Sequence, residues 1–354
     1  MDLDRGKVLE ALGNVIEPDL KKDIVSQGLV EELKIEGNKI TMTVKVVNPA
    51  FHSRKRMQEA ISFTLKRFLG NDIEIQANVV GLPTEERQEK THTQNQLLPG
   101  VKHVIAIASG KGGVGKSTVV ANLAGGLAKK GYKVGIVDAD IYGPSMPTMF
   151  DCVGERPTAT EIDGQQKMIP VNSYGIPIMS IGFFTEKDDA VVWRGPMASK
   201  ALTQMFTETH WGELDYLLID LPPGTGDIHL SLVQTIPLDG AIIVSTPQEV
   251  ALADARRGVK MFMMDNINVP IIGLVENMSW FTPAELPDNK YYIFGRDGVK
   301  NLAEGMGQRL LGQIPLVQSV REAGDIGRPA VMQENTIVSK AFDELVDNMI
   351  KILD

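Results

Sequence analysis

The sequence contains a single cysteine, Cys152, among its 354 residues. One thiol excludes a disulfide within the chain, and it excludes a zinc or iron–sulfur site built from four thiolates of one chain. No apolar run approaches the roughly 20 residues that a membrane-spanning helix requires. The first residues are acidic and lack the basic-then-apolar pattern of a signal peptide. We therefore expect a cytoplasmic protein without a membrane partner.

Basic residues are fewer than acidic residues in this sequence. The sequence has 36 Lys and Arg against 45 Asp and Glu, a formal net charge of -9, and no dense basic run. Because non-specific nucleic-acid binding depends on clustered Lys and Arg, we expect no nucleic acid among the partners. The hydrophobic fraction of 43% and the charged fraction of 23% are typical of a globular protein, and the length is sufficient for two domains.

Residues 1–82 predict a small α+β domain. The patterns indicate helices and strands at 4–15 (helix), 29–35 and 40–47 (strands), 53–69 (helix) and 72–80 (strand). Gly37 and Asn38 lie between the first two strands and predict a hairpin, because both tolerate the positive φ of a tight turn. Residues 83–100 are mostly polar and predict a flexible linker.

Residues 101–354 predict a second, larger domain. Short continuous apolar runs alternate with helical patterns, as expected of strands buried on both faces of a parallel sheet. The strand runs are 104–108, 134–137, 216–219, 241–244 and 271–275, and the clearest helices are 118–130 and 249–265. The fold class is therefore α/β, with a mostly parallel sheet and helices on both faces, preceded by the small α+β domain.

One glycine-rich segment matches the P-loop pattern G-x-x-x-x-G-K-[ST] in full, and it lies between a predicted strand and a predicted helix. Its residues are Gly110, Lys111, Gly112, Gly113, Val114, Gly115, Lys116 and Ser117, with Thr118 next in the helix. Such a loop wraps phosphate with backbone amides. Lys116 is expected to reach the β- and γ-phosphates, and the Ser117 hydroxyl to ligate Mg²⁺. The segment predicts ATP and Mg²⁺ as ligands.

Acidic residues follow two other predicted strands, at the sheet edge where ligands bind in open α/β folds. Asp138 and Asp140 follow the second strand run, and Asp220 follows the third in a Walker B pattern. We expect Asp138 and Asp220 near Mg²⁺, and Asp140 orienting the attacking water. Asp138 also suits a turn or helix cap. Gly224 lies where a backbone amide senses the γ-phosphate, which makes 221–227 a candidate switch loop.

Base recognition is the least specific part of this prediction. Asn277 follows the last strand run and suits a hydrogen bond to adenine, and Pro315, within 312–315, suits a wall against the ring. The same residues are equally consistent with ordinary loop structure.

The P-loop segment K-G-G-V-G-K-S-T resembles the deviant Walker A of the MinD, ParA, NifH and ArsA superfamily. That resemblance implies a nucleotide-sandwich homodimer in which Lys111 acts in trans on the partner's nucleotide, like an arginine finger. Lys111, Lys116 and Asp140 are then the catalytic candidates of an ATPase that forms ADP and phosphate.

Longer motifs resemble the Mrp/ApbC family of iron–sulfur cluster carrier ATPases. They are D-A-D-I-Y-G-P-S at 138–145, W-R-G-P-M at 193–197, D-L-P-P-G-T-G-D at 220–227 and E-N-M-S at 276–279. Residues 1–82 resemble the SufT-like small domain often fused ahead of this ATPase. The resemblance implies an iron–sulfur cluster as cargo, and iron–sulfur assembly proteins or client apoproteins as partners.

The chain departs from this family where ligands are expected. Many members carry C-x-x-C shortly after E-N-M-S, and the small domain often has a cysteine after its second strand, but neither occurs here. Cys152 is the remaining candidate cluster ligand, but a lone cysteine is more often a small apolar residue than a ligand. Two functions stay open: a cluster carrier, or a nucleotide-switched scaffold without its own cluster. A MinD- or ParA-like positioning ATPase is disfavoured, because the amphipathic tail 341–354 is acidic rather than basic.

Overall fold

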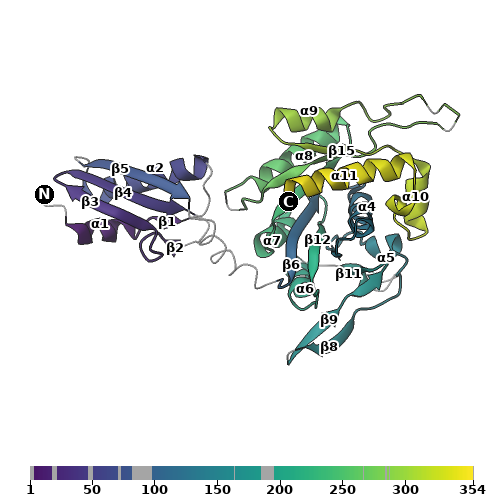
Figure 1. The fold of residues 1–354 in the computed structure, drawn as a ribbon, viewed down its shortest axis with the longest axis horizontal. Helices are drawn as coiled ribbons and strands as arrows, with labels where there is room; N and C mark the ends of the chain where they lie inside the picture. The colour runs from purple at the N-terminus through teal and green to yellow at the C-terminus, as the bar shows by residue number, and fades with distance from the viewer. Residues whose placement is uncertain are drawn as a thin grey trace. The chain divides into compact units, whose positions relative to one another are not determined.

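The computed structural model describes residues 4–17, 22–46, 51–70, 73–81, 98–162, 164–184, 195–265, 267–283, 285–286 and 288–353. The chain divides into two compact units, Met1–Gln94 and Asn95–Asp354 (Figure 1). Most of the expected linker 83–100 lies outside the described residues, so its flexibility stays a prediction.

The described part of the N-terminal unit combines a three-stranded sheet, a separate pair of short strands and two helices. Its elements are α1 (Arg5–Leu12), β1 (Ile16–Glu17), β2 (Lys22–Asp23), β3 (Val30–Glu36), β4 (Lys39–Val46), α2 (Phe51–Leu69) and β5 (Glu74–Gly81). β3 and β4 form the predicted hairpin, in which Glu36 pairs with Lys39 and Gly37 adopts a φ of 63°. β5 runs parallel to β4, with α2 as the crossover between them. The buried face of α2 and alternate residues of β4 form the core of this unit.

The C-terminal unit is built on an eight-stranded sheet with the order β10-β11-β7-β12-β6-β13-β14-β15. These strands are β6 (Val101–Ala108), β7 (Val134–Asp138), β10 (Val171–Ser173), β11 (Ile176–Ser180), β12 (Leu214–Asp220), β13 (Gly240–Ser245), β14 (Ile271–Glu276) and β15 (Leu310–Gln313). Neighbours are parallel except the edge pair β10 and β11. Every residue of β7 and β13 is buried, which explains their continuous apolar runs.

Helices cover both faces of this sheet, as the two halves of the core show (Figure 1). One face packs against α4 (Lys116–Lys129) and α11 (Ile337–Leu353), and nearby lie the short α5 (Met146–Met149) and α10 (Gln318–Asp325). The other face packs against α6 (Gly195–Thr207), α7 (Asp227–Thr235), α8 (Glu249–Phe262) and α9 (Gly298–Gly305). The predicted fold class is confirmed.

The C-terminal helix α11 completes the core around α4. A Cβ added to Gly126 of α4 would lie 2.7 Å from a methyl carbon of Val346 in α11, so the two helices approach closely at this glycine. The segment before α11 also binds α4, because the Val331 amide donates to Oδ1 of Asn122 over 2.8 Å. The C-terminal segments therefore buttress the helix that follows the P-loop.

Several elements have no counterpart in the sequence prediction. They include β10, β11, β15 and the polar hairpin of β8 (Thr158–Ile162) and β9 (Gln165–Ile169), which extends from the unit in Figure 1. β8 and β9 have few buried residues, so they lack the apolar runs by which the other strands were found. Within the described residues, we find no helix with the length and hydropathy needed to cross a bilayer.

Candidate nucleotide site

The P-loop lies between β6 and α4, and its glycines are required by its geometry. Gly113 and Gly115 both adopt a φ of 81°, in the left-handed region that favours glycine. A Cβ on Gly115 would lie 2.2 Å from Nδ2 of Asn277. That Nδ2 donates to the carbonyl of Val114 over 2.8 Å. Asn277, predicted to contact adenine, thus also braces the loop, and its amide nitrogen is already engaged.

Lys116 is the first residue of α4 and points into a cluster of carboxylates. Its Nζ lies 2.5 Å from Oδ1 of Asp220 and 3.3 Å from Oδ2 of Asp140. The lysine side chain is 5% exposed and Asp220 is fully buried. Burial disfavours the ammonium, but attraction to Asp220 and Asp140 outweighs it and raises the pKa of Lys116. The lysine is therefore charged and held by two acids.

Asp138 is anchored from several directions at the end of β7. Its Oδ2 accepts hydrogen bonds from the amides of Ser145 and Met146, both at 3.0 Å, and from the Ser180 hydroxyl at 2.9 Å. Asp138 therefore caps the N-terminus of α5. A helix cap is one of the two roles that the sequence predicts for Asp138, and the other is a place near Mg²⁺. Complete burial, with the nearby charge of Asp220, raises the pKa of Asp138 to about 7.

Asp220, at the end of β12, keeps one oxygen free of hydrogen bonds. Its Oδ2 is buried without a hydrogen-bond partner, while Oδ1 binds Lys116. Such an orphaned carboxylate oxygen beside Ser117 suits Mg²⁺, which prefers oxygen ligands and usually takes one or two carboxylates plus phosphates and water. The described residues contain no group of three or more His, Cys, Asp or Glu arranged to hold a metal. The donor atoms at this position, a carboxylate oxygen and the neighbouring Ser117 hydroxyl, fit Mg²⁺.

The loop after β12 is attached to the P-loop and to α7. The Gly224 amide donates to the carbonyl of Ser109 over 2.9 Å, and Gly224 has a φ of 89°. Nδ1 of His229, in α7, lies 3.1 Å from the Pro222 carbonyl, so it carries the proton of the hydrogen bond. His229 is 2% exposed and packs edge-on against Phe262. The predicted role of Gly224 at the γ-phosphate stays a prediction.

Burial of His229 predicts a loss of stability in acid. Burial lowers the pKa of His229 from 6.5 to about 4. The unfolded state therefore takes up a proton below pH 6.5 that the folded state refuses, so stability is full above pH 6.5 and falls as the pH falls. We expect the free energy of unfolding to drop by about 2 kcal/mol between pH 6.5 and pH 5 from this group.

The variant His229→Asn keeps a hydrogen-bond donor for the Pro222 carbonyl but has no titrating side chain at this position. Between pH 6.5 and pH 5, the unfolding free energy of the variant should therefore fall by about 2 kcal/mol less than that of the wild type. Urea unfolding followed by tryptophan fluorescence is suitable, because all three tryptophans lie in Asn95–Asp354. Equal pH dependence in both proteins would contradict the assignment of a buried neutral imidazole.

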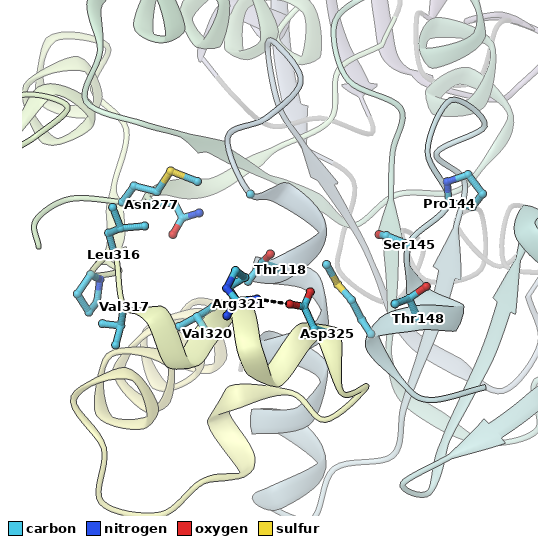
Figure 2. Close-up of a pocket in the computed structure, with 15 residues that line it drawn as sticks. Thr118, Pro144, Ser145, Thr148, Asn277, Leu316, Val317, Val320, Arg321 and Asp325 are labelled. Atoms are coloured by element: carbon cyan, nitrogen blue, oxygen red, sulfur yellow. Dashed lines mark hydrogen bonds and ion pairs between the residues drawn. The ribbon is translucent and has the colours of Figure 1, made fainter. Parts of the chain in front are cut away.

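A pocket of about 440 Å³ opens beside the N-terminus of α4 (Figure 2). Gly115 and Thr118 form its P-loop side, and Asn277 and Pro315 lie where the sequence predicted base contacts. The remaining lining residues are Pro144, Ser145, Thr148, Met149, Met278, Leu316, Val317, Val320, Arg321, Gly324 and Asp325. Its mostly apolar wall with a few polar groups is typical of a small-molecule site.

The structure brings together most of the predicted site but separates some parts. Of 312–315, Pro315 lines the pocket, whereas Gln313 hydrogen-bonds the carboxylates of Glu276 and Asp297 instead. Lys111 is half-buried; its carbonyl accepts a hydrogen bond from the Ser109 hydroxyl over 3.0 Å, and its ammonium has no hydrogen-bond or ion-pair partner among the described residues. Cys152 is 2% exposed within the apolar core, and burial raises the pKa of its thiol to about 11. Such a thiol is poorly suited to ligate iron.

Sequence reasoning missed four groups at this site: Ser180, His229, the α5 residues and α10. Ser180 ends β11, so recognising that strand would have placed it beside Asp138 at the same sheet edge. Only Ala323 of α10 is buried, so this helix carries little apolar periodicity. Of the motif at 193–197, residues 193 and 194 lie outside the described residues.

Family models match both units. One described as "NUBPL iron-transfer P-loop NTPase" matches residues 100–350, and one described as "Iron-sulfur cluster assembly protein" matches residues 5–77. The chain belongs to the NUBPL iron-transfer P-loop NTPase family. The predicted resemblance to iron–sulfur carrier ATPases with a small N-terminal domain is thereby confirmed.

Relatives in this family carry iron–sulfur names. The "Iron-sulfur cluster carrier protein" of Aquifex aeolicus is 42% identical over 95% of this chain and 94% of its own length. The Escherichia coli K12 protein of the same name is 44% identical over 93% of this chain and 86% of its own length. The Arabidopsis thaliana "Iron-sulfur protein required for NADH dehydrogenase, mitochondrial" is 50% identical over 73% of this chain and 81% of its own length.

Solved structures support the same fold. A nucleotide-binding protein in complex with ADP from Archaeoglobus fulgidus has a TM-score of 0.60 and 35% identity, over 69% of this chain and 94% of that chain. The cell division ATPase MinD of Pyrococcus furiosus has a TM-score of 0.52 at 22% identity, over 71% of this chain and 99% of that chain. This likeness supports the fold and nothing further.

Proposed function

We propose that this protein binds and hydrolyses ATP with Mg²⁺ as a homodimer, and that its nucleotide state drives a step of iron–sulfur cluster assembly or transfer. The observation that carries the proposal is the convergence of Lys116, Asp140 and Asp220 at a complete P-loop. The ADP complex of the Archaeoglobus fulgidus relative supports a nucleotide in this place.

Each group has a role in this scheme. Ser117 and Asp220 would hold Mg²⁺, Asp138 would assist them through water, and Lys116 would bind the β- and γ-phosphates. Mg²⁺, when bound, neutralises charge on those phosphates. Asp140 orients the attacking water and is anchored for it, because its Oδ1 accepts the Tyr142 amide over 3.2 Å.

The pocket beside α4 suits the base and ribose. Asn277 donates its Nδ2 to the P-loop, so its Oδ1 is the atom available to accept the adenine amino group. Pro315 supplies an apolar wall for the ring. Hydrolysis would release the contacts that the γ-phosphate makes with the loop containing Gly224, whose amide then returns to Ser109.

A second role in the same process is favoured by the buried cysteine. With Cys152 in the core and no C-x-x-C after 276–279, the chain offers no exposed thiolate for a cluster. A nucleotide-switched scaffold, which recruits assembly proteins without its own cluster, would need none. The carrier names of the relatives favour cluster carriage, and the cysteine count favours the scaffold.

Anaerobic reconstitution with ferrous iron and sulfide, beside an ATP hydrolysis assay, tests both roles. We expect Mg²⁺-dependent hydrolysis in the wild type and in Cys152→Ser, and equal iron contents in the two proteins, because Cys152 is buried. Iron lost in the variant would contradict that expectation and restore Cys152 as a ligand. Hydrolysis without bound iron in either protein would favour the scaffold over the carrier, and absence of hydrolysis would overturn the proposed activity.

A further inference from the structure

The lysine of this P-loop has two competing sets of partners. In the structure Lys116 pairs with Asp220 over 2.5 Å and with Asp140 over 3.3 Å, within a site where the lysine is 5% exposed. A phosphate group at the P-loop requires the same ammonium. Two of the three N–H donors of this ammonium are engaged by the acids, so a phosphate group competes with Asp220 and Asp140 for Lys116.

Loss of Lys116 to a phosphate group is costly for Asp220 in particular. Its carboxylate is completely buried, and its Oδ2 already lacks a hydrogen-bond partner. Removing one partner of a buried ion pair leaves an uncompensated charge and is strongly unfavourable. A nucleotide that brings only negative charge worsens the imbalance, whereas a nucleotide that brings a divalent cation supplies a replacement partner for Asp220.

We propose that Asp220 is a negative determinant of nucleotide affinity, which holds Lys116 away from phosphate until a divalent cation takes the place of the lysine. This inference rests on the proposed ATP site and adds a function to Asp220 beyond that of a metal ligand. The site then discriminates against nucleotides that arrive without a metal ion.

Calorimetric titration of ADP into the full chain, with Mg²⁺ or with EDTA, tests the inference. In wild type we expect metal-free ADP to bind more weakly than Mg²⁺–ADP. In Asp220→Asn the buried negative charge is gone, so affinity for metal-free ADP should rise by about tenfold, the scale of one charged hydrogen bond. Affinity for Mg²⁺–ADP should not rise, because a metal ligand is lost.

The opposite directions of the two effects distinguish this role from simple metal binding. If Asp220 only ligated the metal, the variant would lose Mg²⁺ dependence without binding metal-free ADP more tightly than wild type, and the inference would be overturned. Asp215→Asn is the matched control, because Asp215 lies in the same strand and pairs with Lys102 over 2.6 Å at the surface. It should leave both affinities unchanged.

Asp140→Asn provides a second variant if Asp220→Asn does not fold. Asp140 is the other acid on Lys116 and is more exposed, so a smaller rise in metal-free affinity is expected in the same direction. If the wild type binds ADP equally tightly with Mg²⁺ and with EDTA, this inference is overturned and the proposed function is not. No binding of Mg²⁺–ADP to wild type would overturn the proposed function as well.

Discussion

Lys111→Ala should lower the kcat of ATP hydrolysis by roughly 10³-fold while changing the affinity for ADP less than about threefold. An in-trans cation contributes 10³ to 10⁵ in phosphoryl transfer because it stabilises charge that develops only in the transition state. Lys111 is half-buried and makes no ion pair with other described residues, so its loss leaves no buried charge uncompensated. Steady-state phosphate release and ADP titration measure the two quantities.

Mixing variants determines which subunit supplies the lysine. In a dimer of Lys111→Ala and Lys116→Met chains, the first chain binds nucleotide and receives Lys111 of the partner subunit. An equimolar mixture should recover about a quarter of wild-type activity, since half of the dimers are mixed and each has one complete site. A mixture as inactive as either variant alone would show that Lys111 acts on the nucleotide of its own chain.

Gly110→Ala should destabilise the C-terminal unit by about 3 kcal/mol and abolish nucleotide binding. A Cβ at this position would lie 2.2 Å from the carbonyl carbon of Asp254 and 2.5 Å from the amide nitrogen of Ala255. Both are backbone atoms of α8, so the clash cannot be relieved by a side-chain rotation. Urea unfolding followed by tryptophan fluorescence measures the loss.

Gly112→Ala is the matched control within the same loop. A Cβ at Gly112 has Pro223 Cγ, 4.0 Å away, as its nearest neighbour, and Gly112 is exposed. Its unfolding free energy should stay within about 0.5 kcal/mol of wild type. Comparable destabilisation by both alanines would mean that flexibility of the loop, rather than its contact with α8, requires the glycines.

The sequence predicted those parts of the fold that depend on local pattern. β7 and β12 are buried on both faces, so their apolar runs stand out, and the acids at their carboxyl ends are predictable at the sheet edge that carries the P-loop. β11 was missed because Pro177 interrupts its apolar run, and β15 because it has only four residues. Their positions are set by pairing with strands far away in sequence.

The same limit applied to the site. The sequence predicts functional roles for Asp138 and Asn277, but the hydrogen bonds of these side chains depend on tertiary neighbours that no local pattern encodes. The P-loop pattern indicates that Lys116 binds phosphate, and it gives no sign that Asp220 and Asp140 hold the same ammonium. Alternative partners of one side chain become visible only when the acids are placed in space.

The position of α11 against α4 has a consequence for synthesis of the chain. The helix that follows the P-loop, α4, packs against Val346 of α11. The strand that precedes the P-loop, β6, pairs with β12, which lies more than a hundred residues later in the sequence. During translation the small N-terminal unit, whose contacts are local, can fold early, as domains generally do. The packing around α4 cannot be completed until α11 has left the ribosome, so a chain interrupted before α11 carries the whole P-loop motif on a helix that lacks one of its packing partners.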